Sequence, residues 1–348
     1  MSMTRNIFYA AAALLCSSSA IFFYSCQGDG TQAAPDVSKI DVKLQFQRFD
    51  HDLFALDTTH LADGLPVLAR QYPDFLPFFV TEIAHDETNP NESPLDAITG
   101  FVTAAQVRRL NDSCQAQYAN LDWLQRDLEQ MLRYHRYYFT KRPQPRFVTA
   151  VTEFIGDAYA VNDSLVMIGL DMFLGENFSG YNPDYFPQYL RRQFQKEYIT
   201  TKVALTICSR LVGPPPGEKI LDHMINNGKI LYLMDCLLPE VPDSIKMGYT
   251  RAQIEGCYVN EQEVWARLLE LKVLYQPMNN KNQKIVTPSP STDNVFQESP
   301  GEIGNWVGWQ IVKAYFQRYP NTTLEELLNL RDTQSILEKA RYKPKRVN

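Results

Sequence analysis

The chain has 348 residues, of which 45% are hydrophobic and 21% are charged, and its formal net charge is −6. This acidic balance leaves no basic excess to neutralise phosphates, which argues against a nucleic-acid partner. The apolar content excludes a disordered chain, and six cysteines are too few for a small fold held by disulfides. The sequence therefore predicts a globular protein with one large core or two ordinary ones.

The first 25 residues have the composition of a secretory signal peptide. Arg5 precedes an apolar run over Ile7–Phe23, and the small residue Ser25 stands directly before Cys26. A cysteine in that position resembles a bacterial lipobox, in which the thiol is acylated and the cysteine becomes the new N-terminus. We therefore predict a signal peptide over residues 1–25 and lipidation of Cys26, with palmitate among the acyl groups.

Two features leave alternatives open at this end of the chain. Phe23 and Tyr24 stand where lipoboxes usually carry an aliphatic and a small residue, whereas Cys16 is a poorer candidate because it follows Leu15. The apolar run is also just long enough for an uncleaved signal anchor, and plain secretion is a third alternative. Lipidation would place the protein in the cell envelope, anchored by Cys26 to the outer membrane, with the periplasmic or surface side undecided.

The mature chain begins with a predicted tether over residues 26–38, which are rich in small residues and lack apolar periodicity. Residues 39–348 are predicted to form one globular domain, with a helical front part (39–140) and a rear part of sheet and helices (141–348). Lys39–Phe49 alternates apolar and polar residues as a half-buried strand does. Amphipathic patterns then predict front helices over 49–55, 61–72, 94–111 and 118–139.

The middle of the chain carries short β-rich runs at 146–154, 157–162 and 164–170, with a hairpin-type turn signal at Asn162 and Asp163. A polar loop is predicted over 277–300. The fold class is therefore α+β, predominantly helical with a small antiparallel sheet in the middle of the chain. The remaining helices are predicted over 187–211, 219–238, 250–275, 306–318, 323–330 and 332–340. The helix 250–275 is predicted to begin with a capping box at Thr250 and Gln253.

Sequence motifs of familiar enzymes are absent: the chain has no GxxxxGK[ST], GxGxxG, GxSxG or HExxH, and none of its five histidines lie three or four residues apart. The order of strands followed by two helices does resemble that of zincin metallopeptidases. Lys196, Glu197 and Thr200 stand at the positions of their HExxH motif, and neither lysine nor threonine suits a zinc site. We therefore expect no metal or cofactor, a metal-free zincin-like core as one arrangement, and only Glu197 as a weak catalytic candidate.

Glycines and tryptophans are concentrated between Glu298 and Lys313. This composition suits the floor of a binding groove, because glycine allows close backbone approach beside large flat side chains. The alternative is that the two tryptophans, three residues apart on a helix, fill the core. The candidate groove residues are Glu298, Gly301, Gly304, Trp306 and Trp309, together with Lys229 and Tyr232 on the preceding predicted helix.

Four cysteines of the mature chain lie far apart in sequence, at Cys114, Cys208, Cys236 and Cys257. Their spacing contains no CxxC pair and no metal-binding rhythm. Buried free thiols are one interpretation, and a disulfide between two of them is the other.

Eight stretches in order along the mature chain carry a family resemblance: Arg48–Phe54, Gln71–Phe75, Gly169–Gly175, Gly228–Asp235, Tyr249–Gln253, Asn260–Trp265, Ser299–Ile311 and Tyr342–Lys345. They are similar to the gliding-motility lipoprotein GldB family of the Bacteroidetes. The resemblance implies a lipid-anchored envelope protein that belongs with the gliding machinery and its associated secretion apparatus, with envelope protein partners and no established enzymatic activity. A divergent zincin-like metallopeptidase and a peptide- or glycan-binding envelope module are the alternatives.

Overall fold

The computed structural model of the chain describes residues 34–86, 88–89, 91–292 and 295–345. The predicted signal peptide, Cys26 and most of the predicted tether lie outside the described residues. The described residues form one compact unit. Val37 is already buried in its core, so the packed region begins before Lys39, where the sequence analysis placed the start of the globular domain.

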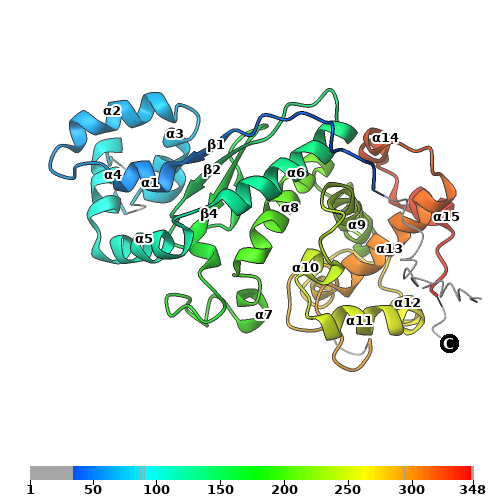
Figure 1. The fold of residues 1–348 in the computed structure, drawn as a ribbon. Helices are drawn as coiled ribbons and strands as arrows, with labels where there is room; N and C mark the ends of the chain where they lie inside the picture. The colour runs from blue at the N-terminus through cyan, green and yellow to red at the C-terminus, as the bar shows by residue number, and fades with distance from the viewer. Residues whose placement is uncertain (1–33, 87, 90, 293–294, 346–348) are drawn as a thin grey trace, which may run out of the picture. The chain divides into compact units, whose positions relative to one another are not determined.

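A four-stranded sheet forms the middle of this unit, in the spatial order β1-β2-β4-β3 (Figure 1). Its strands are β1 (Phe46–Arg48), β2 (Arg146–Ala150), β3 (Ala158–Ala160) and β4 (Leu165–Gly169). The α+β class, mostly helical with a small sheet, is confirmed.

The prediction of an antiparallel sheet is wrong in part, because the sheet is mixed. β1 pairs with β2 and β2 with β4 in parallel, and only β3 and β4 are antiparallel. The order of the strands in the sequence suggests that β3 lies beside β2. Instead, β4 lies between β2 and β3 and runs parallel to β2. The predicted hairpin turn is confirmed, since Asn162 Oδ1 accepts a hydrogen bond from the Leu165 backbone N–H at 2.9 Å.

The sheet separates two cores, because its side chains alternate between its two faces. Phe147 and Ile168 join the large rear core, whereas Val148 and Met167 join a smaller front core. Helices α1 to α4 contribute to the front core (Figure 1). The rear core receives α6, α8 (Ile199–Val212), α9 (Ile220–Leu237) and α13 (Ile303–Arg318). The front helices are α1 (Phe49–Phe54), α2 (Leu61–Gln71), α3 (Leu76–Phe79) with a π-helical turn (Val80–Ala84), α4 (Pro94–Thr103), α5 (Ala105–Tyr118) and α6 (Asp122–Tyr138).

The rear helices are shorter and more broken than the sequence pattern predicts. The predicted helix 187–211 divides into α7, a 3-10 turn and α8, and the predicted helix 250–275 divides into α11 and α12 at Asn260. The Thr250–Gln253 capping box is confirmed. The rear elements are a 3-10 turn (Leu170–Phe173), α7 (Gln188–Arg191), a 3-10 turn (Lys196–Tyr198), α8 (Ile199–Val212), α9 (Ile220–Leu237), α10 (Asp243–Met247), α11 (Arg251–Val259), α12 (Glu261–Glu270), a 3-10 turn (Gln283–Ile285), α13 (Ile303–Arg318), α14 (Leu324–Asn329) and α15 (Thr333–Ala340).

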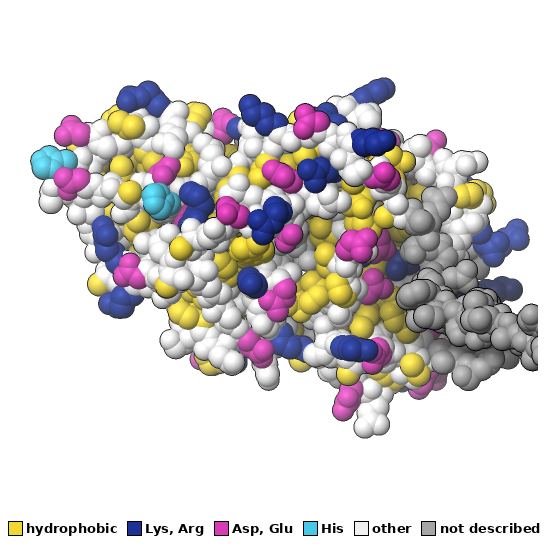
Figure 2. Space-filling view, viewed as in Figure 1, with side chains coloured by type: hydrophobic (Ala, Val, Ile, Leu, Met, Phe, Trp, Pro, Cys, Tyr) yellow, Lys and Arg dark blue, Asp and Glu magenta, His cyan; other side chains and the backbone are white. Residues whose placement is uncertain are grey.

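The surface in Figure 2 mixes acidic and basic side chains, with apolar side chains exposed singly or in small groups. In the described part of the chain, no helix is both long and apolar enough to span a bilayer. The four cysteines are free thiols; Cys114, Cys208 and Cys257 are buried, and burial raises the pKa of the partly exposed Cys236 to about 12.

Candidate functional site

The glycine- and tryptophan-rich stretch leads into α13, which packs against α9 (Figure 1). A Cβ atom added to Gly308 would lie 1.8 Å from the backbone oxygen of Met224, and one added to Gly228 would lie 2.3 Å from the backbone carbon of Gly308. Glycine is required because the two helix backbones touch at this crossing. These glycines therefore serve helix packing.

The structure corrects the groove prediction for the two tryptophans. Trp306 and Trp309 are both completely buried, so neither can form the floor of an open groove. Trp306 packs edge-on against Tyr258 with ring centroids 5.4 Å apart, and Trp309 donates its indole N–H to Asp235 Oδ2 at 2.7 Å. The core-filling alternative describes them correctly.

A network of four charged side chains surrounds Trp309. Asp235 accepts from Lys246 Nζ at 2.6 Å and lies 3.4 Å from Lys313 Nζ, which in turn sits 3.7 Å from the centre of the Trp309 ring. Asp243 lies 3.8 Å from Lys313 and accepts from the hydroxyl of Tyr258. Two lysines and two aspartates balance one another, which is what a partly dehydrated ion cluster requires.

The remaining predicted groove residues do not converge on one cavity. Lys229 is buried and donates to the Leu330 carbonyl at 3.0 Å, and burial together with Arg331 lowers the pKa of Lys229 to about 8. Tyr232 stacks on Phe316 with ring centroids 4.2 Å apart. Gly301 and Gly304 lie against backbone atoms, of Ser289 and Ile285 respectively.

Glu298, another predicted groove residue, lines a pocket. This pocket has a volume of about 450 Å³ and lies between α11 and the loop that leads to α13. Gln253, Asn260 and the buried Ser299 also line it. Among the described residues, the Ser299 hydroxyl has no hydrogen-bond partner.

Two buried carboxylates, which the sequence analysis did not select as site residues, each follow a parallel strand by two positions. Asp50 follows β1, and it accepts from Arg48 at 2.6 Å, from Gln115 at 2.9 Å and from the hydroxyl of Thr149. Burial alone would raise the pKa of Asp50, but hydrogen bonds and the Arg48 charge hold it below its usual value.

The second carboxylate, Asp171, follows β4 and is fully buried. It accepts from the backbone N–H groups of Thr152 at 2.9 Å and Phe154 at 2.7 Å. Glu153 and Phe154 both adopt positive φ, of 53° and 68°, so the backbone folds around the carboxylate. Burial raises the pKa of Asp171 to about 6, and these N–H donors oppose the rise. Both carboxylates lie in stretches that carry the family resemblance, which is the signal that could have identified them.

The weak catalytic candidate Glu197 lies in the 3-10 turn ahead of α8, where it is exposed. Its neighbour Lys196 places its amine 5.7 Å from the centre of the Trp123 ring, and Thr200 is buried at the start of α8. Within the described ranges, no three histidine, cysteine or acidic side chains are grouped as a metal site would need. The amine of Lys196 and the hydroxyl of Thr200, which stand where zinc-binding imidazoles would be, do not suit a zinc centre.

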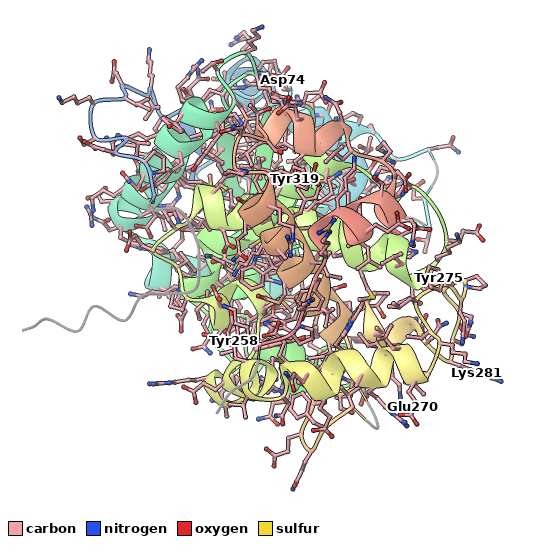
Figure 3. All side chains as sticks on the ribbon, turned by 90° about the vertical axis from the view of Figure 1, so that its right-hand side faces the viewer. Asp74, Tyr258, Glu270, Tyr275, Lys281 and Tyr319 are labelled. Carbon is pink, nitrogen blue, oxygen red and sulfur yellow. The ribbon has the colours of Figure 1, made fainter. Side chains whose placement is uncertain are left out.

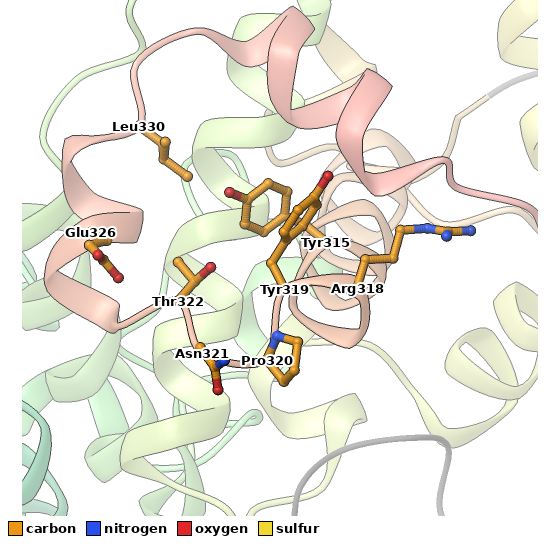
Figure 4. Close-up of a pocket in the computed structure, with 8 residues that line it drawn as sticks. All are labelled: Tyr315, Arg318, Tyr319, Pro320, Asn321, Thr322, Glu326 and Leu330. Carbon is orange, nitrogen blue, oxygen red and sulfur yellow. The ribbon is translucent and has the colours of Figure 1, made fainter.

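A second pocket, absent from the sequence analysis, lies at the C-terminal end of α13 (Figure 4). It has a volume of about 510 Å³, and its lining includes Tyr315, Tyr319 and Leu330. Tyrosines four residues apart at a helix end are the only sequence signal for it.

A comparison with protein families places nearly the whole described chain in one match. The matching family is described as gliding motility protein GldB, and the match covers residues 30–344. Neither the curated proteins nor the solved structures contain a match to the chain.

Proposed function

Because the chain belongs to the family of the gliding motility protein GldB, we propose that it is a lipid-anchored, non-catalytic component of the gliding-motility machinery and its associated secretion apparatus. The family associates the protein with gliding motility and with the cell envelope. The acyl anchor on Cys26, the outer-membrane location and the protein partners are the parts that we propose beyond the family.

One observation supports the non-catalytic part of the proposal: three carboxylates of the family stretches are held by neighbouring groups of the protein. Asp50 pairs with Arg48, Asp171 is enclosed by backbone N–H groups, and Asp235 is shared by two lysines. General acids and bases must reach a substrate, whereas these groups are held by their neighbours. The family stretches thus support a rigid scaffold that presents its surface to partners.

The anchor is tested with a pair of cysteine variants of the full chain. We expect Cys26→Ser to leave the membrane fraction and to fail to restore gliding in cells that lack the protein. Cys16→Ser is the matched control, and it should stay membrane-bound and active. Membrane association of Cys26→Ser equal to that of the parent would contradict acylation at this site.

The scaffold role is tested by cross-linking the full chain in intact cells. We expect the capture of a small, reproducible set of envelope proteins, which should be lost in Cys26→Ser because the soluble protein no longer reaches them. A protein that cross-links to no specific neighbour in gliding cells would argue against a machinery component.

The variant Glu197→Gln distinguishes the peptidase alternative from a non-catalytic role. If the protein is non-catalytic, this variant of an exposed side chain should restore gliding fully. The control is Glu176→Gln, at another glutamate that is partly exposed. A folded, membrane-bound Glu197→Gln protein that fails to restore gliding, while Glu176→Gln succeeds, would favour the enzymatic alternative.

A further inference from the structure

The pocket at the end of α13 has an aromatic wall made by two tyrosines. The rings of Tyr315 and Tyr319 lie with centroids 4.9 Å apart and an angle of 33° between their planes. Tyr315 is 6% exposed and Tyr319 is 43% exposed. Figure 4 shows the two rings together at the centre of the pocket, with Leu330 on one side. The exposed ring of Tyr319 is therefore supported by the buried ring of Tyr315.

Neutral polar groups surround this wall. Tyr315 is more than nine-tenths buried, and no described residue hydrogen-bonds to its hydroxyl. Asn321 and Thr322 also line the pocket, and an amide with two hydroxyls supplies both donors and acceptors.

The two charged residues of the lining already form hydrogen bonds within the protein. Arg318 donates from Nε to the Ala340 carbonyl at 2.7 Å and is directed away from the tyrosines in Figure 4. Glu326 Oε2 accepts from the backbone N–H of Thr323 at 2.7 Å, within the capping box of α14. Their charges are opposite, which leaves the pocket without a net charge to select an ion.

From this chemistry we propose that the pocket binds a sugar unit of a neutral glycan. The flat face of a sugar ring would stack on Tyr319, because its C–H groups are attracted to the negative face of an aromatic ring. Its hydroxyls would bond Tyr315, Asn321 and Thr322. A proline-rich peptide fits less well, since the tyrosine rings pack on each other and leave no slot between them. This inference depends on the pocket alone and is independent of the proposed function.

The test titrates the full chain, in a detergent without a sugar head group, with chitotetraose, maltotetraose and cellotetraose by calorimetry. We expect at least one to bind, with affinity lowered about tenfold by Tyr319→Ala through loss of stacking. Tyr315→Phe keeps the ring and removes the hydroxyl, so it should lower the affinity about 3- to 10-fold.

The matched control is Tyr275→Ala, since Tyr275 is also an exposed tyrosine (56%) and lies elsewhere on the surface (Figure 3). It should bind the sugar as the parent does, and all three variants should keep the melting temperature of the parent. The proposal is overturned if none of the three sugars binds, if Tyr275→Ala weakens binding as much as Tyr319→Ala, or if only a polyproline peptide binds at this pocket.

Discussion

The two faces of the sheet are packed by different means. The front core is filled by large aromatic rings: Phe49 lies 4.8 Å from both Phe75 and Phe79, measured between ring centroids. The rear core is held by a close crossing of α9 and α13 at Gly228 and Gly308, beside a cluster of paired charges. Both cores are filled by buried side chains, but the rear core adds a backbone contact between two helices and a balanced charge cluster.

This difference in packing predicts which substitutions will alter the stability of each half. A glycine in a front helix, Gly100 of α4, has open space around its missing Cβ, whereas Gly308 of α13 has none. Replacing glycine by alanine should therefore change the free energy of unfolding in opposite directions in the two halves. The rear should also respond strongly to loss of one charge, because its remaining partners are poorly solvated.

The largest effect is expected from Asp235→Ala. The substitution leaves Lys246 and Lys313 facing each other and Trp309 without its acceptor, so the free energy of unfolding should fall by about 3–5 kcal/mol. Asp243→Ala is the control at the more exposed end of the cluster, and it should cost about 1 kcal/mol. Urea unfolding followed by tryptophan fluorescence measures both, and equal losses would mean that the cluster does not act through burial.

The next largest effect is expected from Gly308→Ala. The new Cβ would overlap the backbone oxygen of Met224, so α9 and α13 must separate at a cost of about 1–3 kcal/mol. The urea midpoint should fall accordingly. A midpoint equal to that of the parent would show that the helices can part without loss, which contradicts a rear core held by backbone contact.

Glu302 should make the rear core sensitive to pH. It precedes α13 and accepts from Asn305 at 2.9 Å, and burial raises its pKa from 4.5 to about 7. The folded state binds more protons than the unfolded state between these values, so stability should fall as pH rises from about 4.5 to 7.

Glu302→Gln removes this titration. The difference in free energy of unfolding between the variant and the parent should shift in favour of the variant by more than ~1 kcal/mol from pH 4.5 to pH 8. Urea midpoints at both pH values measure this shift. Glu298→Gln, at an exposed position in the same loop, is the control. A parallel pH profile for parent and Glu302→Gln would show that Glu302 ionises normally in the folded protein.

The smallest effect is expected in the front half. Gly100→Ala places a methyl group in open space within α4 and lowers the freedom of the unfolded chain, so stability should rise by about 0.5–1 kcal/mol. The urea midpoint of this variant tests the contrast directly. A loss comparable to that of Gly308→Ala would remove the distinction between the halves.

The sequence predicted the parts of the fold that depend on local patterns. Alternation located β2, β3 and β4, and the Asn162 turn and the Thr250 capping box are where the residue types placed them. Strand order could not be predicted in this way, because nothing local places β4 between β2 and β3. Breaks such as the one at Asn260 were also missed, since the apolar periodicity continues across them.

The candidate site was less predictable, because composition does not reveal which face of a helix is covered. Trp306 and Trp309 have the residue types of a binding groove, but α9 and its neighbours bury both. The tyrosine pocket was missed because only the fold brings Leu330 beside Tyr315. Charges from α9, α10 and α13 likewise meet only in the folded chain.

The position of β1 at the edge of the sheet has a mechanical consequence. β1 pairs only with β2, in parallel, and residues 34–45 lead into it without regular hydrogen-bonded structure apart from a short turn. A pulling force applied from the N-terminal side would first load the buried Val37 and then the β1–β2 ladder, with the Arg48–Asp50 pair behind it. Resistance to such a force depends on the rate of detachment of this strand, and it can differ from the equilibrium stability of either core.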